Sequence, residues 1–78
     1  MNWNKTDSGI QATLKFENQT TLAEFVLKLA KISDETQHHA DMEIRYNQLH
    51  LNIFTHDANA VTEKDEALCH EIEKLLDE

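Results

Sequence analysis

The sequence has 78 residues and a formal net charge of −8, with one Cys, one Gly and no Pro. A chain of this length supplies one hydrophobic core, so we expect a single domain over residues 1–78. The negative charge, without a basic cluster, excludes direct binding to a nucleic-acid backbone, and no apolar run could span a bilayer or serve as a signal peptide. A single Cys forms no internal disulfide, which favours a reducing cytoplasm.

The N-terminal part of the sequence predicts a β-hairpin. Apolar and polar residues alternate as in a half-buried strand, with the apolar positions at Ile10, Ala12, Leu14 and Phe16. The turn signal Asp7-Ser8-Gly9 precedes this strand. Residues 2–6 are therefore expected to form a short first strand.

An amphipathic helix is expected next. Thr21 and Glu24 have the spacing of a capping box, in which a hydroxyl and a carboxylate bind free backbone N–H groups at a helix start. The apolar residues that follow recur at helical spacing: Leu22, Phe25, Val26, Leu29 and Ile32. We expect this helix to start at Thr21 and to end near Ser33.

A second hairpin is predicted over residues 42–54. Asn47 and Gln48 are expected to form its two-residue turn, because Asn tolerates the positive φ that such turns require. This turn places the large apolar side chains on one face of the sheet. It pairs Tyr46 with Leu49, Ile44 with Leu51 and Met42 with Ile53.

A second helix completes the predicted fold. It is expected to start at Thr62, with Asp65 as the acidic partner in a capping box, and its buried stripe comprises Leu68, Ile72, Leu75 and Leu76. The order ββαββα predicts an α+β fold, a four-stranded antiparallel sheet with two helices packed on one face. Because the other face and the edges of this sheet stay uncovered, we expect at least a dimer.

Three imidazoles are candidates for chemistry. Extending the pairing of the second hairpin places His39 opposite His56, with His38 adjacent in sequence and Asp57 nearby. Asp34 lies at the end of the first helix, where the helix dipole disfavours a negative charge, and this conflict marks it as a functional candidate. The alternatives are a frayed helix end with a solvated acid, and three imidazoles that each contact only water.

Two other kinds of site fit the sequence less well. Three His and a carboxylate could supply zinc ligands, but adjacent His38 and His39 point in different directions in most backbones, and no His-x-His pair is present. Cys69 lies in the middle of a predicted helix, with no neighbour that would activate its thiol. We therefore expect neither a metal site nor a Cys nucleophile.

Several residue types at fixed separations resemble the signature of the pterin-4a-carbinolamine dehydratases: Asp34-x-x-x-His38-His39, then Tyr46, Thr55-His56 and Asp65. The resemblance runs from about Trp3 to the end of the chain, and that family also has an antiparallel sheet covered by helices. Ala40 stands where the family usually has Pro. Family members commonly carry an additional N-terminal helix, which we expect this chain to lack.

The resemblance implies an activity. Water would be lost from a 4a-hydroxytetrahydropterin to give the quinonoid dihydropterin, a step in recycling the pterin cofactor of aromatic amino acid hydroxylases. No metal or redox cofactor is implied, and the expected assembly is a homodimer or a homotetramer. A non-enzymatic module that binds a pterin or a protein is the alternative.

The resemblance also implies roles for individual residues. His38 and His56 are expected to be the proton-transfer pair, as acid and base in either order. The remaining assignments are Asp34 and Asp65 as acids that orient the imidazoles, His39 as a pterin-binding residue that shapes the catalytic site, and Thr55 and Tyr46 as substrate-binding residues.

Overall fold

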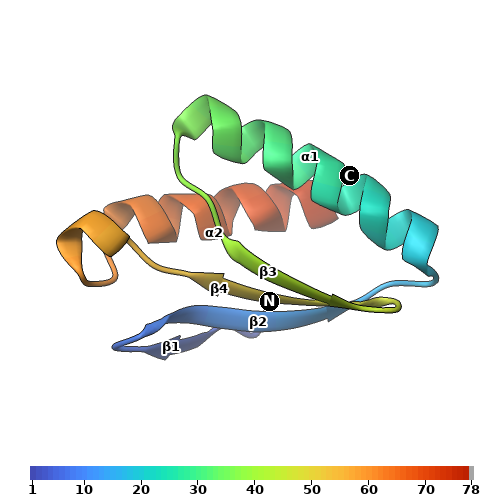
Figure 1. Cartoon of the computed structure of the whole chain (residues 1–78), viewed down its shortest axis with the longest axis horizontal. Helices are drawn as coiled ribbons and strands as arrows, with labels where there is room; N and C mark the ends of the chain where they lie inside the picture. The colour runs from blue at the N-terminus through green and yellow to red at the C-terminus, as the bar shows by residue number, and fades with distance from the viewer. Residues whose placement is uncertain (78) are drawn as a thin grey trace.

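Four antiparallel strands in the order β1-β2-β4-β3 form the sheet, and two helices pack on one of its faces (Figure 1). The structure is a computed structural model and describes residues 1–77. Its elements are β1 (Asn4–Thr6), β2 (Gly9–Lys15), α1 (Gln19–Thr36), β3 (Asp41–Arg45), β4 (Gln48–Ile53), the 3-10 helix η1 (His56–Ala58) and α2 (Glu63–Leu76). The predicted α+β fold is confirmed. Within the described residues, neither helix is both long and apolar enough to cross a membrane.

The core lies between the sheet and the two helices. Alternate residues of β2 and β4 point toward the helices, since successive side chains of a strand face opposite ways, and each helix adds one apolar stripe. The buried apolar residues include Ile10, Leu49, Leu51 and Ile53 from the sheet, Leu22, Phe25 and Leu29 from α1, and Leu68, Cys69 and Ile72 from α2. Leu76, expected in the buried stripe of α2, is 38% exposed.

The first hairpin depends on the one glycine of the sequence. Its turn lies at Asp7 and Ser8, as predicted, but β1 begins at Asn4 and not at residue 2. Gly9 has a φ of 142°, which a side chain rarely tolerates, and a Cβ atom there would collide with the side chain of Asn52 on β4. Glycine is therefore required where β2 begins beside β4.

The start of α1 differs from the prediction. The N-cap is Asn18, whose Oδ1 accepts hydrogen bonds from the backbone N–H of Thr21 at 2.8 Å and from its hydroxyl at 2.9 Å. The prediction of a capping box at Thr21 and Glu24 is therefore wrong. Asn caps a helix as well as Thr does, so the earlier of the two signals sets the start.

The β3–β4 hairpin turns at Tyr46 and Asn47, so the predicted turn at Asn47 and Gln48 is wrong. Tyr46 has a φ of 51°, while Asn47 accepts a hydrogen bond from Phe16 N–H and donates one from its side chain to the Phe16 carbonyl. The register changes accordingly, so that Met42 pairs with Leu51 and Ile44 with Leu49. Because side chains alternate with a period of two, this shift leaves the predicted faces unchanged.

The shorter ladder also changes the relation between two candidate residues. Pairing of β3 with β4 stops at Asp41 and Asn52, so the prediction that His39 faces His56 across the ladder is wrong. His39 lies in the linker of residues 37–40 between α1 and β3, and His56 begins η1. Both still lie at one end of the sheet, because the linker enters β3 where β4 leaves toward η1 (Figure 1).

Candidate active site

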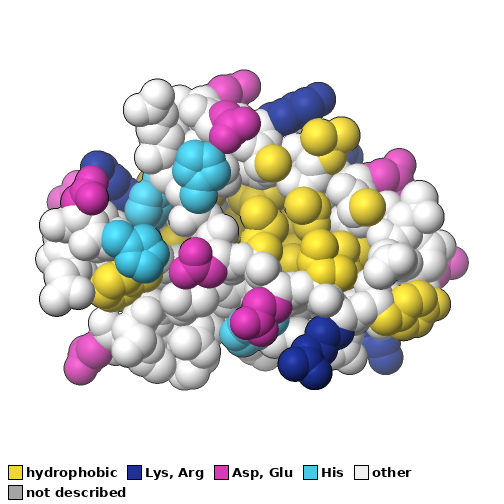
Figure 2. All heavy atoms as spheres, viewed as in Figure 1, with side chains coloured by type: hydrophobic (Ala, Val, Ile, Leu, Met, Phe, Trp, Pro, Cys, Tyr) yellow, Lys and Arg dark blue, Asp and Glu magenta, His cyan; other side chains and the backbone are white. Residues whose placement is uncertain are grey.

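A hollow of about 270 Å³ lies at this end of the sheet. It is bordered by the linker after α1, the start of β3, the segment around η1 and the first turn of α2, and its lining residues are Gln37, His38, His39, Asp41, Phe54, Thr55, His56, Asp57 and Lys64. Figure 2 shows imidazoles gathered beside exposed carboxylates at this end of the molecule. The three imidazoles predicted from the sequence therefore share one hollow.

The pair of His38 and Asp65 is the most buried part of the site. The Nε2 atom of His38 lies 2.5 Å from Oδ1 of Asp65, and the side chains are 13% and 0% exposed. An ionised carboxylate can only accept hydrogen bonds, so Nε2–H of His38 is the donor. This contact joins the linker after α1 to the first turn of α2. The other ring nitrogen of His38, Nδ1, takes no part in it.

Asp65 is held as an anion despite its burial. Burial acts to raise the pKa of its carboxyl, but hydrogen bonds from the Thr62 backbone N–H, the His38 ring and the Thr55 hydroxyl outweigh this effect, and the pKa of Asp65 lies below its ordinary value. The predicted capping box of Thr62 and Asp65 is confirmed. One carboxylate thus caps α2 and binds an imidazole at the same time.

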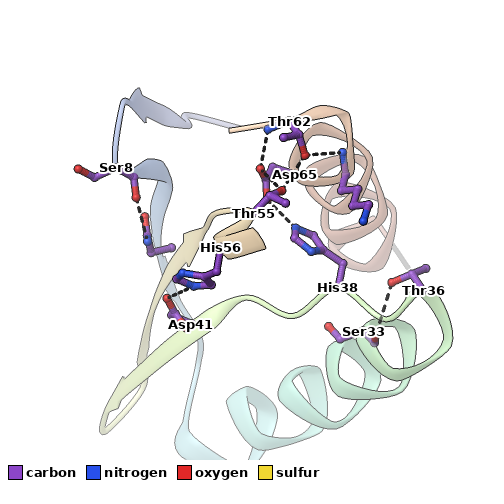
Figure 3. A network of polar contacts seen from close by, with 11 residues as sticks. Ser8, Ser33, Thr36, His38, Asp41, Thr55, His56, Thr62 and Asp65 are labelled. Atoms are coloured by element: carbon purple, nitrogen blue, oxygen red, sulfur yellow. Dashed lines mark hydrogen bonds and ion pairs between the residues drawn. The ribbon is translucent and has the colours of Figure 1, made fainter. Parts of the chain in front are cut away.

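A chain of hydroxyl groups supports this carboxylate (Figure 3). The Lys64 backbone N–H donates to Oγ1 of Thr62 at 3.3 Å, and the Thr62 and Thr55 oxygens lie 2.6 Å apart. Thr55 donates its only hydroxyl proton to Asp65 at 2.8 Å, so the proton between the two hydroxyls belongs to Thr62. Thr55, which is 6% exposed, therefore contacts Asp65 through its hydroxyl instead of presenting it freely to the hollow.

The end of α1 carries the second pair. His39 Nε2 lies 2.8 Å from Oδ1 of Asp34, and both side chains are exposed. α1 continues past the predicted end to Thr36, so Asp34 belongs to an intact helical turn and not to a frayed one. Gln37 then adopts a left-handed conformation with a φ of 56° and donates its N–H to the Ser33 carbonyl, which turns the chain toward the hollow.

The third pair includes a residue that the sequence reasoning missed. His56 Nε2 lies 3.8 Å from Oδ2 of Asp41, and both side chains are exposed. The His56 ring also meets the Phe54 ring edge-on, with centroids 5.3 Å apart. Asp41 was not selected because the contact depends on how η1 folds back beside β3, which no local pattern shows.

One predicted site residue lies away from the hollow. Tyr46, expected to bind substrate, lies at the β3–β4 turn, is 67% exposed and does not line the hollow.

Burial raises the pKa of the Cys69 thiol to about 11, which leaves it protonated near neutral pH. Among residues 1–77, no group of three or more His, Cys, Asp or Glu side chains is arranged to hold a metal ion.

The fold and the site together describe a small α+β protein with three imidazole–carboxylate pairs at one end of its sheet. A family model described as "Pterin 4 alpha carbinolamine dehydratase" matches residues 1–75, and the chain belongs to this family. The family predicted from the sequence is therefore confirmed.

Individual relatives agree with this membership. A protein from Picosynechococcus is 40% identical over 73 residues, which cover 94% of this chain and 79% of that protein. A protein from Thermomicrobium roseum is 36% identical over 73 residues, covering 94% and 78% of the two chains. Both are provisionally named pterin-4-alpha-carbinolamine dehydratases.

A solved structure agrees with the fold. The crystal structure of a transcriptional coactivator/pterin dehydratase from Brucella melitensis superimposes with a TM-score of 0.88 at 25% sequence identity. The superposition covers 94% of this chain and 80% of that protein.

Proposed function

We propose that this protein is a 4a-hydroxytetrahydrobiopterin dehydratase, which converts a 4a-hydroxytetrahydropterin into the quinonoid dihydropterin and water during pterin recycling. One observation carries the proposal. Three imidazoles border one hollow, and each turns its Nε2 atom toward a carboxylate of its own. Membership in the family supports the choice of a pterin as substrate.

The reaction requires two proton transfers and no change of oxidation state. A base removes the proton from N5 of the pterin, and the electron pair of that N–H bond forms a double bond between N5 and C4a. The C4a–O bond breaks as this double bond forms, and an acid donates a proton to the departing hydroxide, which leaves as water. Positioned groups with pKa values near neutrality suit both transfers and typically contribute about 10²- to 10⁴-fold in rate.

We assign the base to His38. Its Nε2–H donates to ionised Asp65, so the lone pair of neutral His38 lies on Nδ1 and can accept the N5 proton. The buried carboxylate then stabilises the imidazolium that forms. Asp65 thereby orients His38 without touching the substrate.

We assign the acid to His56. Its side chain is 72% exposed, so it can regain a proton from water after each turnover, whereas His38 is 13% exposed. His39, oriented by Asp34, borders the hollow and is expected to contact the pterin ring.

A spectrophotometric assay tests the proposal. The 4a-hydroxytetrahydropterin is generated in situ, and its decay is followed with wild type, His38→Ala, His56→Ala and His70→Ala. His70 is a matched control, because it lies on α2 outside the hollow and is 75% exposed. Faster decay with wild type and His70→Ala, reduced by about 10²-fold or more in the other two variants, supports the proposal.

Two outcomes would contradict it. No acceleration by a protein that is folded and binds a pterin would indicate a pterin-binding module on the same fold. Loss of thermal stability in His56→Ala, in step with activity, would indicate a structural instead of a catalytic role for this exposed residue.

We also propose that the protein is cytoplasmic and acts as a homodimer or homotetramer. Large apolar side chains remain exposed, among them Leu27 of α1 at 57% and Ile44 of β3 at 50%. Figure 2 shows apolar side chains gathered between α1 and β3, a surface that association would cover. Sedimentation as a monomer at micromolar concentration would contradict this assembly.

A further inference from the structure

We infer that Asp41 is a positioning residue for His56. The inference rests on the proposed function, in which His56 donates a proton to the departing hydroxide. Asp41 is not one of the residues that carried the resemblance in the sequence analysis, and its role follows from its place beside His56 in the fold.

The contact between Asp41 and His56 joins two segments that are held in place in different ways. Asp41 is the first residue of β3, and its backbone pairs with Asn52 of β4, so the sheet fixes its position. His56 begins η1, whose loop is closed by backbone hydrogen bonds between Thr55 and Ala60. In Figure 3 the His56 ring points toward the Asp41 carboxylate. A fixed strand therefore presents a carboxylate to an imidazole carried by a loop.

The arrangement repeats that of the other two pairs. His38 and His39 also meet their carboxylates through Nε2, at 2.5 and 2.8 Å. The 3.8 Å separation of His56 from Asp41 exceeds a hydrogen bond and fits a free enzyme, in which catalytic contacts are often long and tighten when substrate binds. Once the contact tightens in the substrate complex, Asp41 holds Nε2 of His56, which leaves Nδ1 to face the leaving oxygen.

Other charged groups also face this imidazole. Asp57 on η1, Lys64 on α2 and the linker residues His38 and His39 line the same hollow. Asp57 directly follows His56 on η1 and belongs to the same loop, so it is not an independent anchor for the imidazole. Phe54 meets the His56 ring edge-on and limits its tilt. The contact with Asp41 is then left to select the rotation of the ring about the Cβ–Cγ bond.

Kinetics of matched variants test the inference. Asp41→Asn removes the carboxylate, Asp41→Glu retains it, and Glu43→Gln removes the same charge from the next outward-facing acid of β3, which lies outside the hollow. We expect Asp41→Asn to lower kcat by about threefold to tenfold with KM within about twofold of wild type. Asp41→Glu recovers most of the loss, and Glu43→Gln matches wild type.

Imidazole ¹⁵N spectra give a second readout that needs no turnover. At alkaline pH, where His is neutral, a carboxylate 3.8 Å from Nε2 favours the tautomer of His56 that carries its proton on Nε2. In Asp41→Asn we expect the two His56 nitrogen signals to shift toward each other as this tautomer loses its partner, while those of His50 stay fixed. Glu43→Gln leaves His56 unchanged.

The two readouts separate the possible failures. Unchanged His56 signals in Asp41→Asn, or an equal loss of kcat in Glu43→Gln, would overturn the positioning role. If wild type does not dehydrate the pterin but the His56 signals respond to Asp41→Asn alone, the contact stands and the proposed function fails.

Discussion

The pairs His38–Asp65 and His56–Asp41 border the same hollow but differ in their surroundings. Asp65 is fully buried and accepts hydrogen bonds from a backbone N–H, a hydroxyl and an imidazole. Asp41 is 68% exposed and lies 3.8 Å from its imidazole. The buried pair is part of the framework that holds α2 against the linker, whereas the exposed pair is free to adjust. This difference suits the proposed roles, in which His38 is a fixed base and His56 is an acid that exchanges protons with water.

Removing the buried carboxylate should have the largest effect. The two carboxylate oxygens of Asp65 accept hydrogen bonds from three donors. Asp65→Asn leaves a single acceptor oxygen for these donors, and the new amide N–H₂ group faces one of them. We expect the free energy of unfolding to fall by about 1–3 kcal/mol and kcat to fall by about 10²-fold or more. Urea unfolding and the dehydration assay measure the two losses.

Asp34→Asn serves as the comparison for this variant, because its pair with His39 is exposed. Its stability should change by less than about 1 kcal/mol. Equal losses of stability in the two variants would contradict the distinction between a buried and an exposed pair.

The same contrast predicts a dependence of stability on pH. Burial raises the pKa of Asp65, but its hydrogen bonds outweigh burial and lower the pKa overall. A carboxyl with a lowered pKa in the folded state stabilises the protein above its unfolded pKa of about 4, and this contribution is lost as the pH falls through the folded value. Asp65→Asn should therefore show a smaller drop in Tm than wild type below about pH 4. Parallel Tm curves would show that Asp65 does not contribute in this way.

The sequence predicted the fold because several signals agreed. Alternation in β2 and helical stripes in α1 and α2 are set by which side chains the core can bury, and those patterns survived the errors at the turns. The turn of the second hairpin was misplaced because Tyr46-Asn47 and Asn47-Gln48 give registers that differ by two residues. Both registers bury the same face, so the apolar pattern cannot choose between them.

The site was predictable where it coincided with local patterns. Asp65 could be found both as a cap and as part of the family signature, and His38 and His39 were adjacent in sequence. Asp41 and Lys64 were missed because they reach the hollow only through the path of η1 and the first turn of α2. Tyr46 carried the right residue type for the signature but lies at the far end of its hairpin.

The smallest expected effect concerns the linker that carries the His pair. Ala40→Pro restores the residue that the family usually has there, and it should stabilise the folded state by about 0.4–1 kcal/mol because it restricts the unfolded chain. Ala60→Pro is the opposite case, since the Ala60 N–H donates to the Thr55 carbonyl and proline would remove that hydrogen bond beside η1. Thermal unfolding should show a higher Tm for the first variant and a lower Tm for the second. A lower Tm for Ala40→Pro would mean that the linker needs a backbone conformation that proline forbids, and that Ala40 is part of how this chain positions His39.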